Sequence, residues 1–389
     1  MSHPLGIDAP TGPPAGAVEL PPSTAPRTLA AIWRFGAVPF DPRRNSLNLL
    51  RLVFAFTVLV AHGWYISGEG VGPHLNGENI GGWAVFGFFA ISGYLITGSR
   101  LAKPLGEYLV HRAARIFPAF LVCLAITAAV FAPLNWRWHY GSLDGFLSTG
   151  TTPANYLLSN LTLRMNAYDV GQTPLGVPYP SAWDGSLWSL YYEFGCYLVV
   201  AVLAGAAWFR RSPWGIAGVL ALAVALQANG ARIMPYLGNN PDAAFMIKLL
   251  PFFLGGGLIY LLKDRVAFTW PLAVAATVLG AAFVLRFETW GAQLAAPLIA
   301  YVVLWLGAVL PMPDLLRRHD VSYGIYIYAF PVQQLLAMTG LHHAGLVVFD
   351  VVAAVATVPL AVASWLLVER PVMRRARGRR TPATRALAA

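Results

Sequence analysis

Two ionisable residues, Arg51 and His62, lie eleven positions apart in one apolar stretch, Leu-Leu-Arg-Leu-Val-Phe-Ala-Phe-Thr-Val-Leu-Val-Ala-His. In an α-helix this spacing is about three turns, so both side chains share one face, roughly 16 Å apart along the axis. Ionisable residues inside membrane helices are rare and usually belong to a substrate path or a proton relay. The guanidinium group suits phosphate, and the imidazole suits proton transfer.

Glu193 is a third ionisable residue in an apolar stretch, about two turns from its predicted outer end. An unpaired carboxylate in lipid is costly, so a nearby partner is expected. Counted inward from the predicted outer ends of their helices, Glu193 and His62 fall at similar depths. The sequence predicts a general base with an orienting carboxylate, although a hydrogen bond between packed helices fits the same spacing.

A cluster of basic groups is predicted at the inner ends of the first three apolar stretches. Arg112 and Arg115 are three positions apart and therefore neighbours on one helix face, and Arg100 and His111 precede them. With Arg51, these groups could hold phosphate or pyrophosphate, because guanidinium groups are planar, bidentate donors. For any single inner arginine a role in membrane topology is the simpler explanation, but Arg51 lies one turn inside its apolar run.

The elements that must position these groups are apolar helices. Hydrophobic residues make up 57% of the chain and charged residues only 11%, against about 25% charged residues in soluble domains. Within lipid, backbone polar groups must be paired internally, so runs of about 20 apolar residues are expected to be helices. The sequence predicts an all-α polytopic membrane protein with about ten spans, near 46–65, 80–98, 113–133, 187–208, 214–230, 244–263, 267–285, 290–311, 320–340 and 344–368.

The basic residues predict the orientation of these spans. With the N-terminus inside, 21 of the 27 Lys and Arg residues fall in inner segments or tails and only 4 in outer segments. This asymmetry predicts N-in/C-in topology. It also accounts for the net charge of +10 without a nucleic-acid partner. We expect 1–45 to be a disordered cytoplasmic tail, 46–370 the transmembrane domain with one long outer loop at 134–186, and 371–389 a basic cytoplasmic tail.

Other side chains give weaker signals. The two cysteines lie within apolar spans and are expected to be packing residues, and no spacing indicates a metal site or a common nucleophile motif. Gln333 and Gln334 are expected to hold helices together. Asp350 and Lys248 are assigned no role, because either could reach the outer interface.

The motifs resemble those of the membrane acyltransferase 3 family, bacterial proteins that O-acylate surface sugars and other exported molecules. The resemblance runs from about Asn45 to Arg374 and is specific because seven motifs occur in order. They are Arg51-x10-His62, Phe88-Phe89-Ala-Ile-Ser92-Gly93-Tyr-Leu, Arg100-x10-His111, Arg112-x2-Arg115-Ile-x-Pro118, Ser186-Leu-Trp188-Ser189-Leu-x2-Glu193, Ser322-Tyr323-Gly-Ile-Tyr326 and Glu369-Arg370-Pro371.

The resemblance implies an enzyme of the bacterial cytoplasmic membrane that moves an acyl group from acyl-CoA, with acetyl-CoA as the expected donor. The acceptor would be a hydroxyl of a carbohydrate, a glycolipid or another exported molecule. His62 would be the catalytic base or accept the acyl group itself, and Glu193 would orient the imidazole. The basic groups at the inner side would hold the donor phosphates, namely Arg51, Arg100, His111, Arg112 and Arg115.

Three positions depart from the family pattern. Phe194 and Phe86 stand where many members have acidic residues, and Ala329 stands where many have a histidine. A mechanism with a second histidine or a carboxylate pair is therefore not expected in this chain.

Two other functions fit the predicted topology. One is a transporter or flippase for a sugar or lipid, although transporters commonly contain internal repeats and no second Arg-x10-His pattern occurs here. The other is a non-catalytic partner in envelope assembly, which would function fully without His62.

Overall fold

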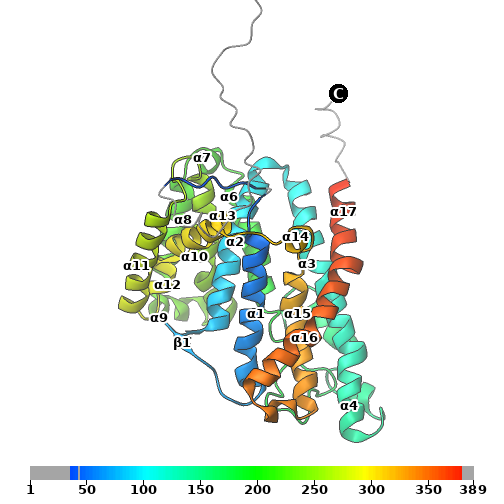
Figure 1. The fold of residues 1–389 in the computed structure, drawn as a ribbon. Coiled ribbons are helices and arrows are strands. Elements are labelled where there is room, and N and C mark those ends of the chain that lie inside the picture. The colour runs from blue at the N-terminus through cyan, green and yellow to red at the C-terminus, as the bar shows by residue number, and fades with distance from the viewer. Residues whose placement is uncertain (1–35, 43, 379–389) are drawn as a thin grey trace, which may run out of the picture.

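The computed structural model describes residues 36–42 and 44–378, and this part of the chain is predominantly helical with almost no strands (Figure 1). The all-α prediction is therefore confirmed. Most of the predicted tail at 1–45 and residues 379–389 lie outside the described residues. The described part of the N-terminal segment packs on the bundle: the Val38 amide donates to the Phe268 carbonyl at 2.8 Å, and the Phe40 ring lies 5.0 Å from that of Tyr94.

The elements follow one another along the chain with short connections, apart from one longer segment between α5 and α6. The helices are α1 (Leu47–Ile66), α2 (Ile80–Ala102), α3 (Leu105–Ile126), α4 (Ala132–Tyr140), α5 (Pro153–Asn160), α6 (Ser189–Leu203), α7 (Ala207–Arg211), α8 (Trp214–Ala228), α9 (Gly230–Ile233), α10 (Pro241–Leu261), α11 (Trp270–Arg286), α12 (Gly291–Leu294), α13 (Ala296–Val309), α14 (Asp314–Arg318), α15 (Ser322–Met338), α16 (Leu346–Ser364) and α17 (Arg370–Gly378). The π-helical turns η2 (Thr127–Phe131) and η6 (Trp365–Glu369) join α3 to α4 and α16 to α17. A hairpin of two short antiparallel strands, β1 (His74–Leu75) and β2 (Glu78–Asn79), precedes α2.

Five helical stretches among the described residues are long and apolar enough to cross a membrane: α1, α2, Leu105–Tyr140, α10 and Leu346–Gly378. The bent pair formed by α8 and Gly230–Leu237, with an angle of 77°, would make a sixth. The helices α6, α11 and α13 are apolar but shorter, and α15 has 17 residues with a proline inside. Each predicted apolar stretch contains a helix, whereas the count of ten and the N-in/C-in orientation remain predictions.

The bundle has two distinct ends. Figure 1 places α7 and the end of α17 at one end, and β1 and α4 at the other. We call these the inner end and the outer end, following the predicted orientation. Residues 371–378, within the predicted basic tail, form most of α17 at the inner end.

The predicted outer loop at 134–186 begins later than expected, because the helix that starts at Leu105 continues to Tyr140. The π turn η2 ends two residues before Pro133, which cannot donate a backbone hydrogen bond to the preceding turn. The segment that follows folds back on this helix. Asn135 exchanges hydrogen bonds of 3.0 and 2.8 Å with the Leu175 backbone, and the Tyr156 hydroxyl donates to the buried Asp184 carboxylate.

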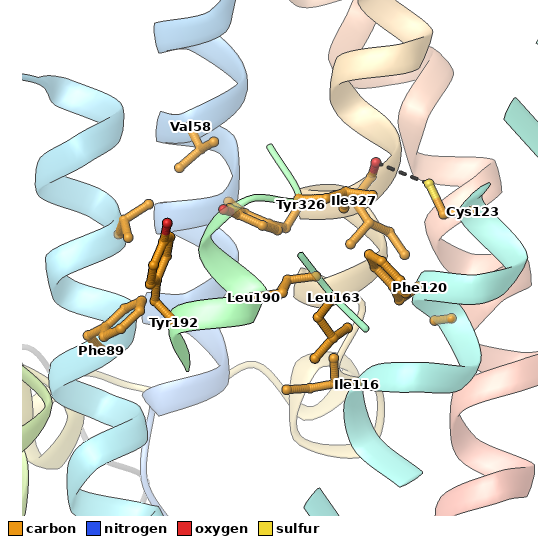
Figure 2. Packing of buried hydrophobic residues seen from close by; sticks show 14 of the residues in the cluster. Val58, Phe89, Ile116, Phe120, Cys123, Leu163, Leu190, Tyr192, Tyr326 and Ile327 are labelled. Carbon is orange, nitrogen blue, oxygen red and sulfur yellow. Dashed lines mark hydrogen bonds between the residues drawn. The ribbon is translucent and has the colours of Figure 1, made fainter. Parts of the chain in front are cut away.

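The core between the helices is packed with large apolar and aromatic side chains. Figure 2 shows Tyr326 and Ile327 of α15 beside Phe120 and Cys123 of α3. The Cys123 thiol donates to the Ile327 carbonyl at 3.4 Å. Both cysteines are buried and free, which agrees with their expected role in packing.

The helices α2 and α10 approach each other backbone to backbone. A methyl group added at Gly93 would overlap the Phe253 carbonyl, and one added at Gly256 would overlap the Ala90 carbonyl. Small residues permit this close approach in membrane proteins. Beside the crossing, the ring of Phe86 stacks on that of Phe252 at 3.9 Å, so this departure from the family pattern is used in packing.

Replacing Gly256 by alanine should therefore destabilise the protein, because the opposing atoms belong to the backbone and cannot move cheaply. We expect a loss of about 1–3 kcal/mol in the free energy of unfolding, measured by thermal unfolding in detergent. The control is Gly218→Ala in α8, where an added methyl group meets nothing within 4 Å and helix propensity favours alanine by up to about 1 kcal/mol. Equal destabilisation by both changes would contradict this account of the crossing.

Candidate active site

A cavity of about 590 Å³ extends into the bundle from its inner end. Its walls belong to α1, α2, α3, α6, α15, η6 and α17, with Lys103 contributed by the connection after α2 and Asp320 by the connection before α15. Along α2 the lining residues run from Ser99 to Val85, a rise of roughly 21 Å along the helix axis. Basic groups line the inner part of the cavity, and hydroxyl and aromatic groups line the deeper part.

Arg115 is held in a network of carboxylates at the entrance of this cavity. Its guanidinium group lies 2.7 Å from Asp320 Oδ2 and 3.0 Å from Glu369 Oε2. Arg51 approaches the same oxygen of Asp320 at 3.7 Å. The predicted proximity of Arg51 and Arg115 is confirmed, but both face a carboxylate that the sequence analysis did not identify.

Asp320 takes its charge state from these neighbours. Burial alone would raise the pKa of this carboxyl group, but the guanidinium groups of Arg115 and Arg51 outweigh that effect and hold the pKa below its ordinary value. Ser322 adds a hydrogen bond of 2.6 Å from its hydroxyl to the Asp320 carboxylate. Asp320 is therefore an anion at neutral pH and shares its charge with both arginines.

Arg112 also lines the cavity but differs in its partners. Within the described residues no carboxylate lies within ion-pair distance of it, and its buried Nε atom has no hydrogen-bond partner. Lys103, by contrast, lies 2.6 Å from Glu107 and 2.9 Å from His111 Nδ1. Arg112 is thus a cation whose charge the described side chains leave unpaired, which is what a site for an anionic ligand requires.

Arg100 is the one predicted donor-binding residue that does not line the cavity. Its Nη1 donates to the Lys103 carbonyl at 3.1 Å, and its guanidinium lies 6.0 Å from the centre of the Tyr108 ring. The physical reason is its position in the last turn of α2, where it closes the helix end instead of turning inward.

Glu193 lines the deeper part of the cavity. Its Oε1 atom accepts hydrogen bonds of 2.7 Å from both Ser92 and Tyr197. The predicted contact with His62 is not formed: no hydrogen bond or ion pair joins the two side chains in the part of the chain that the structure describes. Glu193 instead links α6 to α2 beside open space.

His62 is buried, with 8% of its surface exposed, but it does not line the cavity. Its ring lies 4.9 Å from that of Phe330 and 5.5 Å from that of Tyr65, and its Nδ1 atom has no hydrogen-bond partner among the described residues. Arg51 and His62 share a helix face, as the spacing predicts. The Phe330 ring from α15 packs next to that face at the level of His62.

The motif that begins at Ser186 and the motif that ends at Tyr326 meet beside the cavity. Tyr326 lines the cavity, and Phe330, four residues later on the same face of α15, packs on His62. The Tyr326 hydroxyl donates to the Ser186 carbonyl at 2.8 Å and lies 2.6 Å from Ser189 Oγ. The Ser186 hydroxyl donates in return to the Tyr326 carbonyl at 3.0 Å. These hydrogen bonds hold Tyr326 at the cavity wall, one helical turn from the Phe330 ring that packs on His62.

Polar groups surround the α1 backbone near His62. Gln333 donates to the Leu59 carbonyl at 2.9 Å, which confirms the expected role of this glutamine in holding helices together. Asp350 lies 3.4 Å from Gln333 and directly against Gly63, where an added methyl group would overlap its carboxylate. Asp350, to which the sequence assigned no role, is buried. Lys248 instead pairs with Glu78 of the outer hairpin.

Sequence reasoning missed three charged residues of the cavity wall, Lys103, Asp320 and Arg377. Lys103 and Arg377 stand in basic segments of the predicted inner side, where a topological role is a sufficient explanation. The one available signal was the place of Asp320 two residues before the Ser322 motif.

Comparison with known proteins bears on what this arrangement does. The sequence profile of a family described as "Acyltransferase domain" matches residues 44–366. This range includes all of the cavity wall except the part formed by α17. No solved structure matches the chain significantly.

Three relatives match the chain over most of their length. An "O-acetyl transferase" of Shigella phage Sf6 is 29% identical over 350 residues, which is 86% of this chain and 97% of the relative. "Nodulation protein 10" of Rhizobium leguminosarum bv. viciae is 31% identical over 379 residues, or 85% and 94% of the two chains. "Exopolysaccharide production protein ExoZ" of Rhizobium meliloti is 28% identical over 339 residues, or 81% and 96%.

The charge network at the entrance generates a prediction about stability and pH. The pKa of Asp320 is lower in the folded protein than in the unfolded chain, where an Asp carboxyl has a pKa of about 3.9. As the pH falls below that value, the unfolded chain therefore binds more protons than the folded protein does. The stabilisation by this carboxylate is complete above that value and is lost as the pH falls through the folded pKa. At pH 7, Asp320→Asn should cost about 3 kcal/mol in the free energy of unfolding, because Arg115 keeps Glu369 as a partner.

The difference in unfolding temperature between wild type and Asp320→Asn should therefore shrink when the pH is lowered from 7 to 3. The control is Asp314→Asn, which removes an exposed ion pair with Arg317 and should change stability by less than about 0.5 kcal/mol. A difference that stays the same at both pH values would show that the Asp320 charge is not responsible.

Proposed function

This chain belongs to the acyltransferase 3 family, and from that premise we propose that it transfers an acetyl or other short acyl group from acyl-CoA to a hydroxyl of a cell-envelope carbohydrate. The relatives support this acceptor class, because one is named as an O-acetyl transferase and another for exopolysaccharide production. The cavity with its basic entrance is the structural observation that carries the proposal.

The donor is assigned from the charges of the cavity. Arg112 has a buried Nε without a partner, and the guanidinium group is suited to bidentate binding of phosphate. Arg51 and Arg115 stand beside it on the same cavity wall. We therefore assign the phosphates of acyl-CoA to this inner region, with the extended and largely neutral pantetheine arm directed along α2 toward Ser92.

Glu193 is assigned to the pantetheine arm. Its carboxylate and the hydroxyls of Ser92 and Tyr197 form a hydrogen-bonded group at the cavity wall. Such a group can pair with the amides of a pantetheine arm, which would otherwise lose their hydrogen bonds to water. In this proposal Glu193 positions the donor. It does not orient the His62 imidazole, which is the role that the similar depths of the two residues in the sequence had predicted.

His62 is proposed as the catalytic group. As a general base it takes the proton of the acceptor hydroxyl while the hydroxyl oxygen forms a bond to the thioester carbonyl carbon; the carbon–sulfur bond breaks, and the thiolate of CoA leaves and takes up a proton. In the alternative route the imidazole nitrogen bonds to the thioester carbonyl carbon, the carbon–sulfur bond breaks, and CoA leaves as its thiolate, which takes up a proton. The acceptor hydroxyl oxygen then bonds to the acyl carbon as the carbon–nitrogen bond breaks, and the freed imidazole takes the hydroxyl proton. The free Nδ1 atom of His62 is compatible with both.

We place Tyr326, which lines the cavity, and Phe330, which packs on His62, as a layer between the cavity and His62, and this layer must open for either route. The ring centre of Tyr179, in the outer segment, lies 6.1 Å from that of Phe330 and 5.2 Å from that of Tyr65. We propose that the acceptor approaches His62 over this outer segment. Movement of the Phe330 ring would then connect the acceptor's approach with the cavity that holds the donor.

The catalytic role of His62 is tested with inverted membrane vesicles given labelled acetyl-CoA. His62→Ala should lower transfer of label to envelope carbohydrate at least about 100-fold, the usual minimum contribution of a general base, with unchanged abundance in the membrane. The control His74→Ala changes an exposed histidine of the outer hairpin and should retain activity. Full activity of His62→Ala would refute the assignment, and movement of an unmodified sugar without an acyl product would support a flippase.

The donor site is tested by Arg112→Gln in the same vesicles. The KM for acetyl-CoA should rise about 10-fold or more, because a charge-assisted hydrogen bond to phosphate contributes about 1.5–3 kcal/mol. Arg265→Gln, which changes an exposed arginine of the predicted inner side outside the cavity, should leave the KM unchanged. An unchanged KM in Arg112→Gln would argue against a phosphate role.

A further inference from the structure

The C-terminal helix α17 forms part of the cavity wall. It continues from α16 through the π turn η6 and packs against α3 at the inner end of the bundle (Figure 1). Its sequence, Arg-Pro-Val-Met-Arg-Arg-Ala-Arg-Gly, lies beyond residues 44–366 that match the family. The contribution of α17 to the site is therefore not covered by the family match.

One face of α17 is turned toward the cavity. Met373, Ala376 and Arg377 line it, at a spacing of three and four residues that places them on one side of a helix. Ala376 is buried, and its backbone hydrogen-bonds with the His111 imidazole of α3. Arg375 lies on the opposite face, is exposed and does not line the cavity. The helix is thus fixed in rotation, with one arginine directed to the cavity entrance.

Arg377 is a cation without a counter-charge in the part of the chain that the structure describes, since no carboxylate lies within ion-pair distance of it. Arg112 shares this property, but its Nε is buried, whereas Arg377 is exposed at the entrance. The cavity therefore presents two unpaired guanidinium groups, one at the entrance and one within. A ligand with two separate phosphate groups would match them both.

We propose that α17 forms a subsite for the adenosine 3′-phosphate of acyl-CoA, with Arg377 as the residue that binds this phosphate. The proposal rests on the proposed function, because it assumes a CoA donor. Acyl-CoA carries a diphosphate between the pantetheine arm and the ribose and a separate 3′-phosphate on the ribose, so Arg112 is assigned to the former and Arg377 to the latter. The Met373 side chain lies beside Arg377 and offers an apolar contact for the adenosine.

The test compares acetyl-CoA with acetyl-dephospho-CoA, which lacks only the 3′-phosphate, in the vesicle assay. Arg377→Gln should raise the KM for acetyl-CoA about 10-fold, from the loss of one charge-assisted hydrogen bond, without changing kcat. It should leave the KM for acetyl-dephospho-CoA unchanged, while Arg377→Lys should recover part of the affinity for acetyl-CoA. The matched control Arg375→Gln changes the same residue type on the opposite face and should behave as wild type.

An equal rise in KM for both donors in Arg377→Gln, or the same loss in Arg375→Gln, would overturn the subsite. Binding of free CoA is measured in parallel through the thermal shift of the purified protein. If wild type binds CoA more tightly than dephospho-CoA and Arg377→Gln does not distinguish them, the subsite stands even if no acyl transfer is detected. Failure of wild type to bind CoA would overturn it, whereas failure of transfer alone would count only against the proposed function.

Discussion

The largely buried charge network around Arg115 is the interaction on which the inner half of the molecule depends. Removing a charge from water costs several kcal/mol per ion unless it is paired, so Arg115, Asp320 and Glu369 must meet with good geometry. Arg115 is 205 positions from Asp320 and 254 positions from Glu369 in the sequence. Their pairing fastens α3, the connection before α15 and η6 together. Because α17 continues directly from η6, the same junction also sets where the last wall of the cavity stands.

The cavity has different chemistry along its length because different helices close it. Its inner part carries five Lys and Arg side chains, and only some of them face carboxylates, which favours a ligand with several negative charges. Its deeper part ends at Tyr326, held by mutual hydrogen bonds with Ser186 and Ser189. Two sequence motifs that resemble the family's signatures therefore shape the floor of the cavity together. The most direct functional candidate, His62, stands beyond this floor.

Close helix packing makes room for this arrangement. At the crossing of α2 and α10, Gly93 and Gly256 allow the backbones to touch, which leaves the opposite face of α2 free to line the cavity from Ser99 to Val85. The outer segment is fastened separately, through Asn135 and Asp184. The two ends of the molecule are thus built by independent sets of contacts, and α1 and α15 connect them.

The sequence by itself determined the helical class, the location of the apolar helices and the shared face of Arg51 and His62, because apolar length and helical spacing are local properties of the chain. It also identified most of the basic groups at the inner end. Only the tertiary structure decided their partners: Glu193 pairs with Ser92 and Tyr197 instead of His62, Arg100 turns away from the cavity, and Asp320 and Arg377 join its wall. Depth along a helix can be counted from sequence, but the rotation and tilt of each helix against its neighbours follow from packing between distant segments. Those two quantities decide which side chains meet.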